Sequence, residues 1–147
     1  MFIKDVNIYS SNLPEVSREA VNDFIDNKET LIRLVDDKLV SREDIEELIG
    51  NNHLDEIFEY HKYHYRLMAQ FFKTNDFKLL FNLIPRIYKN YKQVDFSYDY
   101  FKEDLKTWIP VIDKFLKPDN VLSINEVYSR MLEKHQNFVA LSQKINN

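Results

Sequence analysis

The sequence contains no cysteine and only one glycine, Gly50. Without cysteine the chain cannot form disulfides, thiolate metal sites or iron–sulfur clusters, and it has no cysteine nucleophile. The loops that cradle phosphates in nucleotide-binding proteins need several glycines, so nucleotide-dependent chemistry of that kind is excluded. The lack of cysteine is also typical of proteins that work in a reducing compartment, and we predict a cytoplasmic location.

Long hydrophobic runs and an excess of positive charge are missing as well. No apolar stretch approaches the ~20 residues that span a membrane, so we expect no membrane-spanning segment. Residues 1–5 lack the pattern of a secretory signal peptide, and none is expected. The net charge is −4 at pH 7. Because non-specific binding to nucleic acid or to an anionic membrane needs a positive field, neither is predicted as a partner.

What the sequence does contain is a globular balance of side chains that is rich in aromatic rings. Its 147 residues are 44% hydrophobic and 30% charged, and they include 11 Phe, 9 Tyr and 1 Trp. This length and balance predict a single domain over residues 1–147, with residues 1–10 as an N-terminal arm. Because a buried tyrosine needs a partner for its hydroxyl, the core should contain polar contacts.

Apolar residues recur at spacings of three and four along most of the chain, which predicts helices and no strands. Proline, capping and glycine signals place the helices at residues 14–25, 29–38, 41–50, 54–73 with Asn52 as cap, 77–91, 98–115 after Ser97, and 124–145 after a capping box at Ser123. Pro85 and Pro110 fall inside two of these helices and should bend them. The predicted fold is all-α: a bundle of about four long helices preceded by short ones, with a globin-like stack as the alternative.

Three of the four histidines fall on or beside the apolar faces of these helices. His61 and His135 are in phase with the hydrophobic positions, and His64 follows His61 by about one helical turn. Side chains three residues apart on a helix can face the same ligand, and His135 could join them if the two helices are neighbours. His61, His64 and His135 are therefore candidate ligands for a transition metal or a haem.

Other features of the sequence argue against such a site. Carboxylate-bridged di-iron bundles carry a glutamate three residues before each histidine, but those positions hold Phe58, His61 and Leu132. No Asp or Glu falls in the hydrophobic stripes to complete a metal site, and residues 77–91 contain no histidine for a haem. We favour the interpretation that His61 or His135 lies at the core edge and bonds a tyrosine hydroxyl, a backbone carbonyl or water, with no cofactor.

No group of residues points to catalysis. Ser41, Ser97 and Ser123 lie at predicted helix starts, where a serine side chain caps the helix, and no pair of inward carboxylates stands out. The basic, aromatic stretch 85–92 and the acidic stretch 43–59 are interpreted as solvated faces. His53 is expected to be exposed at a helix start. The chain is therefore predicted to be a binding module rather than an enzyme.

Four short motifs resemble helical domains of bacterial sensor or regulatory proteins, some of which precede a cobalamin-binding module. They are His61-x-x-His64, LIPRIYKNY at 83–91, FSYDYF at 96–101, and Tyr128-x-x-Met131-x-x-x-His135. The Asp-x-His-x-x-Gly signature of the cobalamin module cannot occur here, because the only glycine is Gly50. The resemblance therefore implies a signalling-type helical module without cobalamin.

These observations predict a non-enzymatic interaction or sensor module of the bacterial cytoplasm. Its partner would be another protein or a second copy of itself, because exposed aromatic side chains would suit such a contact. The alternative is a metal- or haem-binding helical protein that uses His61, His64 and His135.

Overall fold

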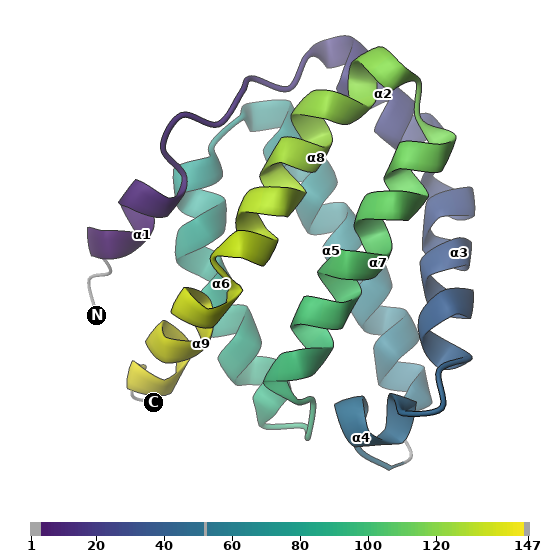
Figure 1. Cartoon of the computed structure of the whole chain (residues 1–147), viewed down its shortest axis with the longest axis vertical. Helices are drawn as coiled ribbons and strands as arrows, with labels where there is room; N and C mark the ends of the chain where they lie inside the picture. Colours follow the sequence, from purple (N-terminus) through teal and green to yellow (C-terminus); the bar gives the residue numbers. More distant parts are fainter. Residues whose placement is uncertain (1–3, 52, 146–147) are drawn as a thin grey trace.

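The computed structural model describes residues 4–51 and 53–145, and these residues form nine α-helices and no strand (Figure 1). The all-α prediction is confirmed. The bundle of about four long helices is not confirmed, because the helical residues are divided more finely than that. The helices are α1 (Lys4–Tyr9), α2 (Arg18–Asp26), α3 (Lys28–Val40), α4 (Ile45–Ile49), α5 (Leu54–Thr74), α6 (Phe77–Lys92), α7 (Tyr98–Phe115), α8 (Pro118–Glu133) and α9 (His135–Lys144).

Side-chain caps fix the starts of three helices. The Ser97 hydroxyl accepts a hydrogen bond from the backbone N–H of Tyr100 at the start of α7, as the sequence predicts. Asp76 caps α6 in the same way. Helix α2 begins at Arg18 with Ser17 as its cap, so the predicted start at Pro14 is wrong. The Ser17 hydroxyl accepts a hydrogen bond from a backbone N–H in the first turn of α2, and the Pro14 side chain has no acceptor atom.

The predicted caps at Ser41 and Ser123 do not form. The Asp44 carboxylate binds the Arg42 side chain, and the Ser41 hydroxyl donates to the Lys38 carbonyl, so neither caps α4. Ser123 lies inside α8, which already begins at Pro118. A proline suits that first position because it has no N–H to leave unpaired.

The two ends of the chain also differ from expectation. Within the predicted N-terminal arm, residues Lys4–Tyr9 form helix α1, which packs on α6. The predicted last helix is two helices, because α8 ends at Glu133, Lys134 caps both helices, and α9 begins at His135. The cap of α5 is His53, and the predicted cap Asn52 lies outside the described residues. Helices α6 and α7 continue past Pro85 and Pro110.

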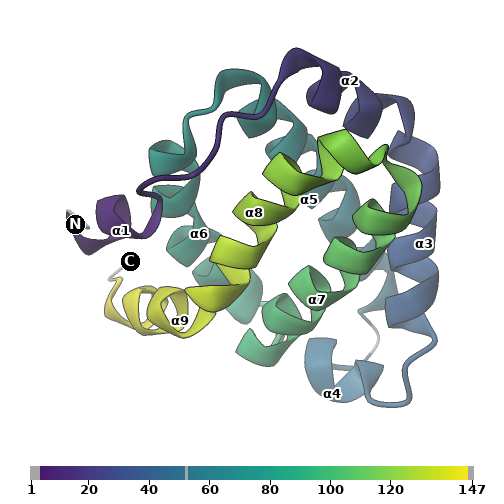
Figure 2. The same cartoon turned by 45° about the horizontal axis from the view of Figure 1, so that its top comes forward.

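Helix α7 packs against both α3 and α8, and α6 packs against α9 and α1. In Figures 1 and 2, α5 lies behind α7 and α8, with α3 on one side and α6 on the other. The large rings of the core fill the space between these helices, and Trp108 and Phe72 are fully buried. Leu54 and Phe115 are exposed because they are terminal residues of α5 and α7.

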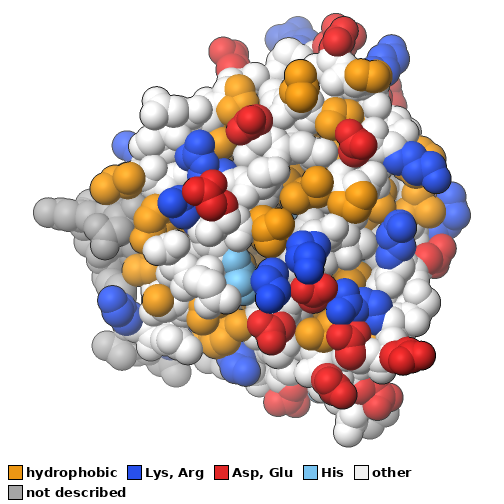
Figure 3. Space-filling model, viewed as in Figure 1, with side chains coloured by type: hydrophobic (Ala, Val, Ile, Leu, Met, Phe, Trp, Pro, Cys, Tyr) orange, Lys and Arg blue, Asp and Glu red, His pale blue; other side chains and the backbone are white. Residues whose placement is uncertain are grey.

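The outer surface mixes side chains of all kinds. On the face in Figure 3, hydrophobic side chains lie in small separate groups, and charges of both signs gather toward the lower right, over α4 and the neighbouring end of α7. Among the helices formed by the described residues, none combines the length and the apolar character that crossing a membrane requires.

Candidate functional site

The three core histidines of the sequence are all buried, and each ring makes a hydrogen bond with a tyrosine hydroxyl. His61 and His64 lie on α5, and His135 is the first residue of α9. The nitrogen–oxygen distances are 2.5 Å for His61 Nε2 and Tyr100, 3.0 Å for His64 Nε2 and Tyr128, and 2.8 Å for His135 Nδ1 and Tyr88. The prediction of histidines bonded within a tyrosine-rich core is confirmed.

His61 also lies between two carboxylates, and we call Asp36, His61 and Asp104 the core triad. The Nδ1 atom of His61 is 2.6 Å from Asp36 Oδ1, and its Nε2 atom is 3.4 Å from Asp104 Oδ1. The three residues come from α3, α5 and α7, and α3 packs against both of the other helices. A single titratable base is therefore shared by two acids in the centre of the fold.

Asp104 is only 1% exposed and is held by its own helix. The indole N–H of Trp108 donates to Asp104 Oδ1 over 3.1 Å. Burial raises the pKa of Asp104 to about 7, although the neighbouring His61 and the Trp108 hydrogen bond favour the ionised form. Both polar contacts use Oδ1, so Oδ2 remains for another partner.

The prediction that no carboxylate faces the core is therefore wrong. Asp104 follows Phe101 by three residues and precedes Trp108 by four, which puts it in phase with two core rings. This spacing indicates a carboxylate that points toward the core. It is missed when the buried face of a helix is identified from hydrophobic residues alone.

The other two histidines are held in their neutral form. Burial, together with the nearby His61, lowers the pKa of His64 to about 3. Its ring centroid is 5.0 Å from that of Trp108. Burial also lowers the pKa of His135, and Lys102 acts in the same direction. The Nε2 atom of His135 is buried without a hydrogen-bond partner.

A narrow cavity of about 20 Å³ lies beside this polar core and has room for about one water molecule. Its mouth is marked by Tyr63, Leu67 and Ile87, which are only half-buried and lie on α5 and α6. Asp104 and His64 contribute polar groups to a wall that is otherwise mostly carbon. The residues that line it are Tyr60, Tyr63, His64, Leu67, Ile84, Ile87, Tyr88, Phe101, Asp104, Leu105 and Met131.

The three predicted metal or haem ligands each bond a tyrosine hydroxyl in this structure. His61 has both ring nitrogens engaged by protein groups, so it has no free lone pair for a metal. Within residues 4–51 and 53–145, no three His, Asp or Glu side chains are placed to hold a metal ion. The His61 side chain is also 0% exposed, so its ring cannot touch a molecule from solvent.

The fourth histidine, His53, is half-buried at the start of α5 instead of exposed. Its Nδ1 atom is 3.5 Å from a carboxylate oxygen of Glu56, and its Nε2 atom is 3.4 Å from one of Asp95. The two carboxylates account for the position of the ring at this end of the molecule.

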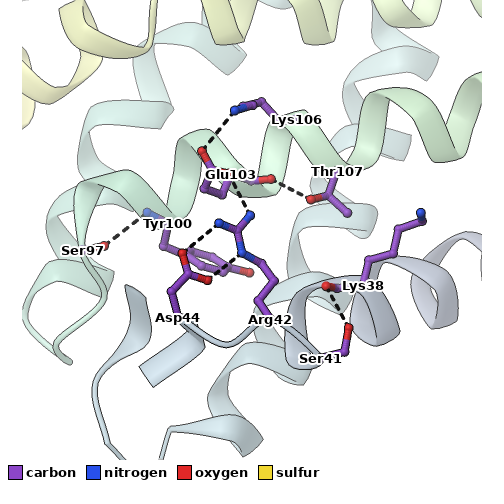
Figure 4. A network of polar contacts seen from close by, with 9 residues as sticks. All are labelled: Lys38, Ser41, Arg42, Asp44, Ser97, Tyr100, Glu103, Lys106 and Thr107. Atoms are coloured by element: carbon purple, nitrogen blue, oxygen red, sulfur yellow. Dashed lines mark hydrogen bonds and ion pairs between the residues drawn. The ribbon is translucent and has the colours of Figure 1, made fainter. Parts of the chain in front are cut away.

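A second polar cluster lies at the surface between the α3–α4 connection and α7 (Figure 4). Arg42 donates to both oxygens of Asp44, at 2.8 and 2.9 Å, and to Glu103 Oε1 at 2.8 Å. We call Arg42, Asp44 and Glu103 the surface triad. Arg42 holds the pKa of Asp44 below its usual value, and the pKa of Glu103 is also low, because Arg42 and Lys106 outweigh its partial burial.

No protein-family model matches the chain, and no similar curated protein or solved structure is found. The resemblance to bacterial sensor domains therefore stays a prediction from sequence motifs.

Proposed function

We propose that the chain is a non-enzymatic sensor or regulatory module of the bacterial cytoplasm that acts by contact with another protein or with a second copy of itself. Its titratable core groups are turned inward around the cavity, where a protein partner cannot reach them. Large apolar side chains, by contrast, are exposed at the surface. The resemblance to sensor domains agrees with this division between an inner site and an outer contact.

The observation that carries the proposal is that helix α8 belongs to both regions. Leu122 near its start is 73% exposed, whereas Tyr128 and Met131 farther along are buried. Tyr128 binds His64, and Met131 lines the cavity. A change in the cavity would therefore move the same helix that presents Leu122 to a partner. Small shifts of packed helices are a known means of coupling two sites.

The test compares two exposed leucines, Leu122 on α8 and Leu79 on α6. We expect the wild type to associate with a second copy in light scattering over a concentration series, or to retain a protein partner in a pull-down. The variant Leu122→Glu should lose that association, and the matched control Leu79→Glu should keep it.

Both changes add a carboxylate at an exposed site, so circular dichroism should show both variants folded. A wild type that stays monomeric and retains no partner would refute the proposal. Equal behaviour of the two variants would also refute it, because α8 would then have no special part in the contact.

A further inference from the structure

The core triad contains two carboxylates but only one base. His61 is 2.6 Å from Asp36 and 3.4 Å from Asp104, so its single possible charge is held mainly by Asp36. Among the residues that the structure describes, no lysine or arginine is buried to neutralise the second acid. An unpaired buried carboxylate is costly. Asp104 must therefore take either a proton or a cation from outside the chain.

The cavity beside Asp104 has the walls that suit an organic cation. The aromatic rings of Tyr60, Tyr88 and Phe101 all line it. Aromatic rings attract organic ammonium groups. A hard metal cation would instead require several oxygen ligands, and this wall is mostly carbon.

We propose that the cavity binds a small primary ammonium cation, whose head group pairs with Asp104 Oδ2 against the rings of Tyr60, Tyr88 and Phe101. A volume of about 20 Å³ admits a head group of roughly the size of water. A longer substituent on the ammonium group would extend out of the cavity through its mouth at Tyr63. This assignment rests on the proposed function, since it names the ligand to which the module would respond.

Binding of the cation competes with binding of a proton at Asp104. Burial raises the pKa of this carboxyl to about 7, so near neutral pH a cation must displace a proton from part of the molecules. Of the groups around it, His64 and the buried tyrosines stay uncharged, because burial lowers the pKa of His64 and raises those of the tyrosines. The titratable groups that face this region are Asp36 on α3, Tyr60, His61 and His64 on α5, Tyr88 on α6, Tyr100 on α7, Tyr128 on α8, and His135 on α9 through Tyr88.

The experiment is a calorimetric titration of the full chain with methylammonium chloride, with methanol as the uncharged analogue of equal size. We expect saturable binding of methylammonium that is about tenfold weaker at pH 6 than at pH 8. The ionised fraction of Asp104 differs by about tenfold between these two pH values when its pKa is near 7. Methanol should not bind. Binding should be lost in Asp104→Asn and kept in Asp99→Asn, which makes the same change at an exposed site of α7.

A second measurement on the wild type covers the case in which Asp104→Asn does not fold. Titrations at pH 7 in two buffers of different ionisation enthalpy should show release of about half a proton per cation bound. Absence of saturable binding, equal binding of methanol, or unchanged affinity in a folded Asp104→Asn would overturn the assignment. If methylammonium binds but leaves self-association or partner retention unchanged, the cation site is supported and the regulatory function is refuted.

Discussion

The core triad and the surface triad have the same arrangement of groups, but the pKa values of their α7 carboxylates shift in opposite directions. Each places one base between two carboxylates, and each connects α7 to the chain at or just after α3. Their α7 members, Glu103 and Asp104, are adjacent in sequence. At the surface the pKa of Glu103 lies below its usual value, whereas in the core the pKa of Asp104 is raised to about 7.

The difference shows that burial, together with the number of charged partners, decides the ionisation state of the carboxylate that α7 contributes. Each triad has two carboxylates around one base, but at the surface Lys106 also lies 3.4 Å from Glu103. Water reaches the Arg42 and Asp44 side chains, which are 32% and 40% exposed, and the guanidinium keeps its own charge at any physiological pH. In the core triad Asp104 is only 1% exposed, so water barely solvates its charge, which has to be neutralised by a proton or a cation.

The largest expected effect comes from removing the ring that supports the core triad. Trp108→Ala deletes a fully buried side chain and the N–H that binds Asp104, so the free energy of unfolding should fall by roughly 3–5 kcal/mol. Urea denaturation measures this loss. Phe115→Ala, at the exposed end of the same helix, is the control and should cost much less. A loss below about 1 kcal/mol for Trp108→Ala would contradict the packing of this region.

The next effect is the pH dependence that Asp104 gives to stability. Because its pKa is raised on folding, its contribution to stability is fully present below about pH 4 and is lost as the pH rises toward 7. The loss is roughly 1.4 kcal/mol per pH unit, or up to about 4 kcal/mol over that window. We expect the stability of the wild type relative to Asp104→Asn to decline by this amount in urea denaturation between pH 4 and pH 7.

His64 contributes with the opposite sign, which is why the variant is needed. Its pKa is lowered to about 3, so its contribution is present above about pH 6.5 and is lost as the pH falls toward 3. The two slopes largely cancel in the wild type between about pH 4 and pH 6.5. In Asp104→Asn the His64 slope should stand alone, and the variant should lose stability as the pH falls. An identical pH profile for the two proteins would refute the assigned state of Asp104.

The sequence predicted the helices and the histidine–tyrosine contacts because both follow from local periodicity and from the needs of a buried hydroxyl. It did not predict which tyrosine each histidine would meet, since Tyr100 and Tyr128 lie 39 and 64 residues beyond His61 and His64. The pairing of His61 with Asp36 is likewise a product of helix packing. The residue pattern of a single helix does not indicate such contacts between helices.

The wrong helix boundaries have a local cause. Ser41 and Ser123 both have the spacing of a capping box, but a competing interaction prevails at each. At residues 41–44 the stronger charged contact between Arg42 and Asp44 occupies the side chain that would complete the box. At residues 118–124 the proline starts the helix earlier than the serine could. Short motifs of similar strength cannot be ranked from sequence alone.

The smallest expected effect is at the surface triad. Arg42→Met keeps an unbranched apolar stem and removes the guanidinium, and we expect the free energy of unfolding to fall by about 0.5–1 kcal/mol. Because salt screens exposed charges, this loss should shrink between about 0.05 M and about 1 M salt in urea denaturation. Lys62→Met, which removes an exposed pair with Glu59, is the control and should change little. A loss that exceeded about 2 kcal/mol and did not respond to salt would mean that water does not solvate the charges of the surface triad. The contrast with the core triad would then rest on partner number instead of solvation.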